Sequence, residues 1–346
     1  MESFIFKKDL WRKDYNCSLL SDEEWAKERN PNPALGYFYL IIGIVFMVPY
    51  VPCLIVMLKR ELFKFSCYKI MFFLGLIDFI TLTFNAVLTG ILTIQGAVFC
   101  TYPNLIFVAG QVSMSLWCTA CVGCSLLAFN RCVDLWRPKW MVYVFSDNMT
   151  YLWLCLPVGY FFFFVSFTRP VLYTSKAYAW FFDPYFEISG IDVGRTQYTN
   201  FPHTVNNLAV VIVLLSLYFF LSTSLWCKAR STGSAVLSGV QRQIVIQSCT
   251  ICAFNFIAAL IYVYMQFFET SMIFVVMGQI AWQGSHGGPA VVYLTLNKTI
   301  RGNVFRLVRH GQLTSSIAPT MMERGSLQRK SVPRSSQGNG DPSTPK

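Results

Sequence analysis

The sequence predicts an all-α membrane protein: a bundle of seven transmembrane helices, then a short amphipathic helix and a disordered tail. The chain is 54% hydrophobic and only 13% charged, whereas a soluble domain usually carries about 25% charged residues. Seven apolar stretches come close to the ~20 residues that a helix needs to cross the hydrocarbon core. Basic residues gather in alternate loops between these stretches, as in cytoplasmic loops.

The apolar stretches define the predicted domains. Their approximate bounds are 35–58, 70–95, 104–130, 151–167, 205–227, 243–266 and 272–296. The fourth stretch is short, but the run from Phe161 to Phe164 indicates a membrane environment. The predicted domains are an extracellular segment (1–34), the transmembrane domain (35–296), a cytoplasmic amphipathic helix (297–310) and a cytoplasmic tail (311–346). No internal repeat is visible, which argues against transporters built from inverted repeats.

Loop charge predicts the orientation of the bundle. The loops after the first, third and fifth stretches hold Lys59, Arg60, Lys64, Lys69, Arg131, Arg137, Lys139, Lys228, Arg230 and Arg242. The alternate loops hold Arg169, Lys176 and Arg195. The positive-inside rule therefore places the N-terminus outside and the C-terminus in the cytoplasm. Asn16, in an Asn-Cys-Ser glycosylation sequon, fits that placement. An inverted bundle stays an alternative, because the N-terminal segment is also rich in basic residues.

The C-terminal region indicates contact with membrane lipid. Segment 297–310 alternates apolar and basic residues in the pattern of an amphipathic helix on the inner leaflet. The tail from Gly311 is rich in Ser, Pro, Gly and Arg, which predicts disorder. The net charge of +11 lies in such short clusters, so it suits an anionic leaflet and not a nucleic acid.

Two charged residues stand out within the apolar stretches. Asp78 lies midway along the second, where a carboxylate costs about 2.5–3.5 kcal/mol on insertion scales and should face the bundle interior. It is either a cation or proton site that responds to conformation, or a protonated, hydrogen-bonded structural residue. Arg131 ends the third stretch and is either a snorkelling positive-inside residue or a cytoplasmic switch.

The cysteines predict one disulfide and no metal site. Cys17 and Cys100 are the cysteines of the predicted outside segments, which leaves one intramolecular pairing there. Cys118, Cys121 and Cys124 share a helical face. We interpret them as small residues at helix contacts, since no fourth ligand follows at motif spacing.

A small-molecule site between the helices would use polar and aromatic residues of their outer halves. The candidates are Phe107, Gln111, Met114, Asn206, Asn207, Tyr262, Gln266, Gln279, Trp282 and Gln283. Hydrogen bonds between helices, without any ligand, explain the same polar residues.

Motifs of enzymes are absent from the sequence. The three histidines, His203, His286 and His310, lie far apart, and no zinc-protease, nucleophile-elbow or Walker motif is present. We therefore predict no enzyme, cofactor or metal. A channel or transporter would need polar residues repeated across several spans. A ligand-free trafficking or structural protein is the other alternative.

The sequence resembles the nematode serpentine chemoreceptors of class T. The resemblance is carried by these segments: 15–18 (YNCS), 36–37 (GY), 66–71 (SCYKIM) with Asp78, 99–100 (FC), Asn130-Arg131, and 289–294 (PAVVYL) with Asn297. It implies a G-protein-coupled receptor in the plasma membrane of sensory neurons, including their cilia, with an unknown small-molecule ligand and a heterotrimeric G protein as partners.

The chain departs from the broader rhodopsin-like pattern at its switch residues. Asn130 replaces the acid before Arg131, so the resting ion pair between these neighbours cannot form. Gly288 precedes Pro289 where an Asn is usual, and Tyr293 comes one position late. The sixth stretch has no proline, and Ala120 replaces the serine of the sodium site, which puts the usual hinge and sodium binding at Asp78 in doubt.

Overall fold

The computed structural model describes residues 1–346 apart from 137, 192–194, 232–238, 269 and 311–346. The predicted tail at 311–346 therefore lies outside the described residues. Internal contacts divide the chain into two units, Met1–Arg301 and Gly302–Lys346. The first unit contains the helix bundle.

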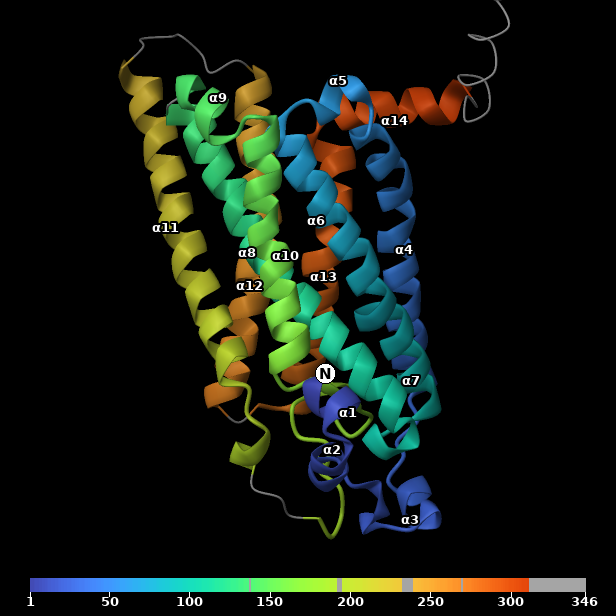
Figure 1. Ribbon diagram of the computed structural model, residues 1–346. Coiled ribbons are helices and arrows are strands. Elements are labelled where there is room, and N and C mark those ends of the chain that lie inside the picture. The colour runs from blue at the N-terminus through green and yellow to red at the C-terminus, as the bar shows by residue number, and fades with distance from the viewer. Residues whose placement is uncertain (137, 192–194, 232–238, 269, 311–346) are drawn as a thin grey trace, which may run out of the picture. The chain divides into compact units, whose positions relative to one another are not determined.

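Seven long helical runs form this bundle in the described part of the chain, and the predicted fold class is confirmed (Figure 1). They are α4 (Pro33–Met57), α6 (Ser66–Leu82) continued by η2 (Thr83–Leu88) and α7 (Thr89–Gln95), α8 (Pro103–Trp136), α10 (Asp147–Phe167), α11 (Phe201–Ser231), α12 (Gly239–Phe267) and α13 (Met272–Leu296). The short elements are α1 (Glu2–Phe6), α2 (Lys8–Asp14), η1 (Cys17–Leu19), α3 (Asp22–Lys27), α5 (Arg60–Phe63), η3 (Phe99–Thr101), η4 (Pro138–Trp140), α9 (Met141–Val144) and η5 (Arg195–Tyr198). Helix α14 (Lys298–His310) forms where the amphipathic helix was predicted.

Five of the described helical runs are long and apolar enough by themselves to cross a membrane. They are Pro33–Met57, Ser66–Gln95, Pro103–Leu135, Asn148–Phe167 and Phe201–Leu221. α12 adds a shorter apolar stretch, and α13 is less apolar because Gln279, Gln283 and His286 lie within it. These three side chains are fully buried, so α13 turns its polar face to the bundle interior and not to lipid.

The observed helices differ from the predicted stretches by a few residues at most ends, and two of the differences bear on candidate residues. The second contains the π-helical turn η2, a widened turn of the kind often found at functional sites. The third continues to Trp136, because Cys132 and Leu135 extend its buried face beyond the predicted end. Arg131 therefore lies inside a helix and not at its end, which corrects the prediction.

Small residues let the helices approach closely. A Cβ atom added to Gly36 of α4 would lie 2.7 Å from the carbonyl oxygen of Gly90 in α7, so this contact tolerates no side chain. Close helix pairs of this kind gain dispersion contacts that substitute for the hydrophobic effect inside a bilayer.

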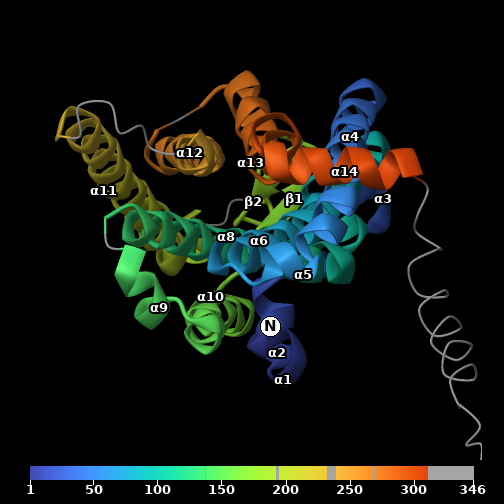
Figure 2. The ribbon, with the colours of Figure 1, turned by 90° about the horizontal axis from the view of Figure 1, so that it is seen from above.

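A β-hairpin from the loop between α10 and α11 reaches into the end of the bundle that carries the N-terminal segment. Its strands, β1 (Leu172–Thr174) and β2 (Ala179–Phe181), pair antiparallel, and the hairpin contacts α8 and α13 (Figure 2). The indole N–H of Trp180 donates to the hydroxyl of Thr89 at 2.8 Å. A Cβ atom at Gly110 of α8 would lie 1.6 Å from the Val171 carbonyl oxygen, so the hairpin can sit at this depth only because residue 110 is glycine.

Candidate functional site

A cavity lies directly beneath the hairpin, between α8, α11, α12 and α13. Its volume is about 30 Å³, well below the ~300–1,000 Å³ typical of ligand pockets. The described residues that line it are Met114, Trp117, Val171, Trp180, His203, Tyr262 and Trp282. They are mostly aromatic and apolar, and none of them carries an acidic, lysine or arginine side chain.

Three of the predicted ligand residues lie in this lining: Met114, Tyr262 and Trp282. Asn207 lies behind the lining, where its Oδ1 accepts the indole N–H of Trp117 at 3.0 Å. Asn206 donates to the same oxygen at 3.1 Å. The predicted contact at Gln266 lies outside the described side chains.

Phe107 and Gln111 are not brought into the cavity, although they share a face of α8 with Met114. Phe107 packs under the N-terminal segment, with its ring 5.1 Å from that of Phe4 and 5.1 Å from that of Tyr15. Gln111 Nε2 donates to the Phe164 carbonyl of α10 at 2.6 Å. Turns of one helical face thus meet different neighbours at different depths of the bundle.

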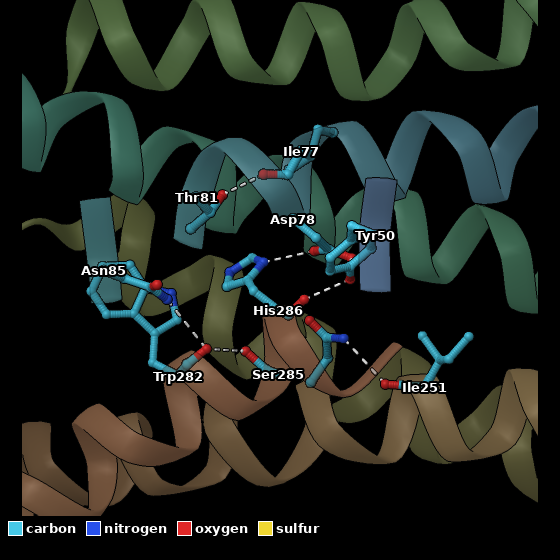
Figure 3. A network of polar contacts seen from close by, with 10 residues as sticks. Tyr50, Ile77, Asp78, Thr81, Asn85, Ile251, Trp282, Ser285 and His286 are labelled. Carbon is cyan, nitrogen blue, oxygen red and sulfur yellow. Dashed lines mark hydrogen bonds and ion pairs between the residues drawn. The ribbon is translucent and has the colours of Figure 1, made fainter. Parts of the chain in front are cut away.

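Gln279 and Gln283 join α13 to the widened turn of the second helix. Their Nε2 groups donate to the backbone carbonyl of Asn85 at 2.7 and 3.0 Å, respectively. Asn85 Nδ2 in turn donates to the Trp282 carbonyl at 3.4 Å (Figure 3). These residues therefore form hydrogen bonds between helices beside the cavity.

Asp78 is the centre of a buried polar network between α4, α6 and α13 (Figure 3). Its Oδ1 lies 2.7 Å from Nδ1 of His286, and its Oδ2 accepts the hydroxyl of Tyr50 at 2.9 Å. The Tyr50 hydroxyl also lies 2.6 Å from the His286 carbonyl oxygen. The carboxylate thus has two partners on two other helices, which compensates part of the cost of its burial.

His286 also connects this network to the cavity. Its ring meets the ring of Trp117 edge to face, with 5.8 Å between centroids, and Trp117 lines the cavity. A molecule that displaces Trp117 would therefore act directly on the partner of Asp78.

Arg131 is buried near the other end of α8. One guanidinium nitrogen donates to Asn130 Oδ1 at 2.9 Å, and another lies 3.4 Å from a carboxylate oxygen of Asp134. Asn130 Nδ2 donates to Ser66 of α6 at 2.9 Å. Asn130 thus provides a neutral acceptor, while an acid one turn later provides the ion pair.

The remaining predicted switch residues lie in α13. Pro289 is inside the helix, and the Tyr293 side chain is fully buried, with no hydrogen-bond partner for its hydroxyl among the described residues. Close packing surrounds them, since a Cβ at Gly288 would lie 2.7 Å from the ring of Phe254 in α12.

A disulfide joins the N-terminal segment to η3, directly before the third helix. Cys17 and Cys100 are bonded, with 5.5 Å between their Cα atoms. The segment is also held by hydrogen bonds from Tyr185 to the Asn16 carbonyl at 2.9 Å and from Tyr198 to the Asp14 carbonyl at 2.7 Å. Within the described residues, no group of three or more His, Cys, Asp or Glu side chains is placed to hold a metal ion.

Comparison with known sequences agrees with this arrangement. The family described as "Serpentine type 7TM GPCR chemoreceptor Srt" matches residues 3–316. The chain belongs to the Srt family. Members of this family are multi-pass membrane receptors, so the resemblance read from the sequence is confirmed.

Two known proteins resemble this Srt chain. Serpentine receptor class T-55 of Caenorhabditis elegans is 29% identical over 302 residues, which cover 85% of this chain and 80% of that protein. The crystal structure of squid rhodopsin matches with a TM-score of 0.64 over 92% of this chain and 98% of that chain, at 12% identity. At that identity the likeness to squid rhodopsin concerns the fold alone.

Sequence reasoning missed three important residues of the Srt chain. His286 was considered only as a metal ligand, although its place in a polar run of the seventh span makes it a candidate partner for Asp78. His203 was set aside on the same ground, yet it lines the cavity. Trp180 could not have been found, because only the hairpin brings it over the cavity.

Proposed function

We propose that this chain is a chemosensory receptor that binds a small molecule in the cavity beneath the hairpin and signals to a heterotrimeric G protein. One observation carries the proposal: Trp117 lines the cavity and at the same time contacts His286, the partner of Asp78. A ligand that binds one arrangement of these side chains more tightly shifts the population of the whole bundle.

Signalling to a G protein would use the opposite end of the bundle. Support comes from Arg131, which is held by Asn130 and Asp134 near the end of α8, and from the basic loops on that side. Release of Arg131 from Asp134 would expose a cationic group to the partner. The basic helix at 297–310 would rest on the anionic inner leaflet.

The proposed topology has residues 1–34 outside, 35–296 in the membrane, and 297–310 and 311–346 in the cytoplasm of a sensory neuron, at its plasma membrane or cilia. Its support is the loop charge, the Asn16 sequon and the Cys17–Cys100 disulfide, since disulfides persist outside the cytosol. Enzymatic deglycosylation of the full chain tests it: a mobility shift that is lost in Asn16→Gln is expected, and an unchanged mobility of the parent chain would contradict it.

The receptor function is tested by filling the cavity. Cells that express the full chain with a calcium reporter are exposed to a broad library of small molecules, with and without G-protein blockade. Met114→Trp should raise the half-effective concentration of any agonist at least about tenfold, because the larger ring takes up space that the ligand needs.

Met277→Trp is the matched control, because Met277 lies on the lipid-facing side of α13 and is 53% exposed. It should respond like the parent chain at equal surface display. Responses that survive G-protein blockade would favour a channel, and an unchanged response of Met114→Trp would remove the cavity from the mechanism.

A further inference from the structure

A second cavity lies where three helices of the bundle end or begin, far from the hairpin. Its volume is about 450 Å³, within the ~300–1,000 Å³ typical of ligand sites. The described residues that line it are Leu58, Arg60, Phe63, Lys64, Lys69 and Tyr151. The proposed receptor function does not use this cavity.

The lining residues lie at the level where the helices leave the membrane. Leu58 directly follows α4, while Lys69 and Tyr151 lie in the first two turns of α6 and α10, respectively. The short helix α5, which connects α4 to α6, supplies further lining residues. Tyrosine and basic residues at the ends of spans are typical of the boundary between hydrocarbon and headgroups. The cavity therefore lies at the depth of the phospholipid headgroups.

The lining is strongly cationic. Arg60, Lys64 and Lys69 contribute three positive side chains, and none of the described lining residues is acidic. Lys69 is only 5% exposed, and its Nζ lies 4.8 Å from the centroid of the Tyr151 ring, which also lines the cavity. The ring attracts a cation but carries no net charge, so the positive charge around the cavity stays in excess. An anion that enters the cavity lowers the repulsion between these cations.

Charge and polarity together indicate which anion fits. A headgroup with one negative charge balances only part of three positive charges, whereas each phosphomonoester carries about −1.5 to −2 charges at pH 7. Basic pockets between membrane helices bind phosphorylated headgroups of this kind. Leu58 and Phe63 add apolar surface beside the cations, and Leu58 is 52% exposed. That surface suits the acyl chains of a lipid better than a free phosphate.

From these contacts we infer that the cavity binds a membrane lipid whose headgroup carries more than one phosphate, the class of the phosphorylated phosphatidylinositols. The phosphates contact Arg60, Lys64 and Lys69, and the acyl chains pass along Leu58. The bound headgroup joins the ends of α4, α6 and α10. The inference goes beyond the proposed receptor function. The proposed topology adds only that the lipid comes from the cytoplasmic leaflet.

Native mass spectrometry of the purified full chain in detergent micelles tests the inference, because it counts bound lipid molecules. Phosphatidylinositol bisphosphate is titrated in parallel with phosphatidylinositol and phosphatidylserine, whose headgroups carry a single net negative charge. Inositol trisphosphate serves as the headgroup without acyl chains. The bisphosphate lipid should bind at least about tenfold more tightly than either lipid of single charge, since its additional phosphates engage further basic residues.

Lys64→Gln removes one exposed cation of the lining and should weaken binding of the bisphosphate lipid about fivefold. Lys139→Gln is the matched control, because Lys139 is an exposed lysine of η4, between α8 and α10, and does not line the cavity. It makes the same change in net charge and should leave the affinity unchanged. Lys69→Gln should weaken binding more than Lys64→Gln, since a buried ammonium is less screened by solvent. The comparison of Lys64→Gln with Lys139→Gln holds even where Lys69→Gln does not fold.

The outcomes distinguish a built site from general attraction. Phosphatidylserine that binds as tightly as the bisphosphate lipid, or an equal loss in Lys64→Gln and Lys139→Gln, would assign binding to the basic loops as a whole and overturn the inference. Inositol trisphosphate that binds as tightly as the lipid would make the ligand a soluble phosphate and overturn the lipid source. None of these results bears on agonist responses, so the receptor function is judged separately by Met114→Trp.

Discussion

The Asp78 carboxylate and the His286 imidazole form a pair whose side chains are 6% and 0% exposed. At this depth solvent weakens the interaction little, and the stability of each side chain in the interior depends on its partner. Tyr50 adds a third contact from α4, so three helices meet at one carboxylate. The stability of the bundle and the position of α13 therefore both depend on a few polar atoms.

Substitution of His286 by Ala should destabilise the receptor strongly. Removing one partner of a buried hydrogen bond leaves the other unsatisfied and costs about 1–3 kcal/mol. The double variant Asp78→Asn with His286→Ala should lose clearly less than the sum of the two single variants, as expected for residues in contact. Thermal unfolding in nanodiscs measures all three. Additive losses would show that the two side chains do not interact.

At this scale the sequence predicts that Asp78 is interior but not which residue pairs with it. Because a charge in a bilayer is costly, Asp78 can be placed in the bundle interior without any structure. Which residue pairs with it depends on the rotation of α13 about its axis, which the packing of Gly287 against Phe46 and of Gly288 against Phe254 sets. For the same reason Gln279 and Gln283 were correctly seen as interior, while their common acceptor, the Asn85 carbonyl, was not.

The hairpin is the element that defines the cavity, and Gly110 is the position that permits it. A Cβ at residue 110 would lie 1.6 Å from the Val171 carbonyl oxygen. Gly110→Ala should therefore displace the hairpin and abolish agonist responses, or lower their potency at least about tenfold, since a site whose supporting contacts shift by about 1 Å loses its function. Reporter assays at equal surface display measure this.

Gly159→Ala provides the control for that prediction. Gly159 lies in α10, and a Cβ there would meet no atom within 4 Å. Alanine favours helix over glycine by about 1 kcal/mol, so this variant should respond like the parent chain. An equal loss of response in both variants would mean that the effect is not due to the hairpin.

The transmembrane helices can be predicted from the sequence, whereas the hairpin cannot. Long apolar stretches predicted all seven helices, and Met272–Leu296 was predicted with its observed bounds. The strands have three residues each, and their alternation is too short to distinguish from a loop. Their position comes from contacts with α8 and α13, which are distant in sequence. Long-range contacts of this kind also account for the unexpected place of Phe107.

On the scale of the whole molecule, segments far apart in sequence hold together the end of the bundle that carries the N-terminal segment. Glu28, directly after α3, pairs with Lys176 in the hairpin turn at 2.6 Å. The hydrogen bond from Lys176 holds the pKa of Glu28 below its ordinary value of 4.5. A lowered carboxylate pKa stabilises the folded form above the ordinary value, and this stabilisation is lost as the pH falls through the lowered value.

Acidification should therefore loosen α3 before it unfolds the bundle. Hydrogen–deuterium exchange of the α3 amides over a series of acidic pH values should show protection that falls as Glu28 becomes protonated. In Glu28→Gln this acid-dependent step should be absent, and protection at neutral pH should already be reduced. A step that is unchanged in Glu28→Gln would assign it to another group.

At the end of the bundle far from the hairpin, the Arg131–Asp134 pair is expected to set the proportion of inactive to active receptor. Asp134 is 39% exposed and pairs with the buried Arg131, so the pair is worth about 0.2–1 kcal/mol. Asp134→Asn should raise basal G-protein signalling by up to about fivefold, which corresponds to such an energy.

Arg131→Ala should instead reduce agonist signalling at unchanged surface display. Nucleotide exchange on the G protein measures both, and a basal rate unaffected by Asp134→Asn would refute a latch at this pair.

The Cys17–Cys100 bond has a consequence for biosynthesis. Both cysteines precede α8, so the ribosome has made them before any residue of the cavity on α8, α11, α12 or α13 exists. Once the first two spans are inserted, oxidation can fix the N-terminal segment over the nascent bundle. The hairpin and the helices from α8 onward are then added to a chain whose residues 17–100 already form a closed loop. The order of synthesis thus allows the N-terminal segment to be fixed before the proposed binding site forms.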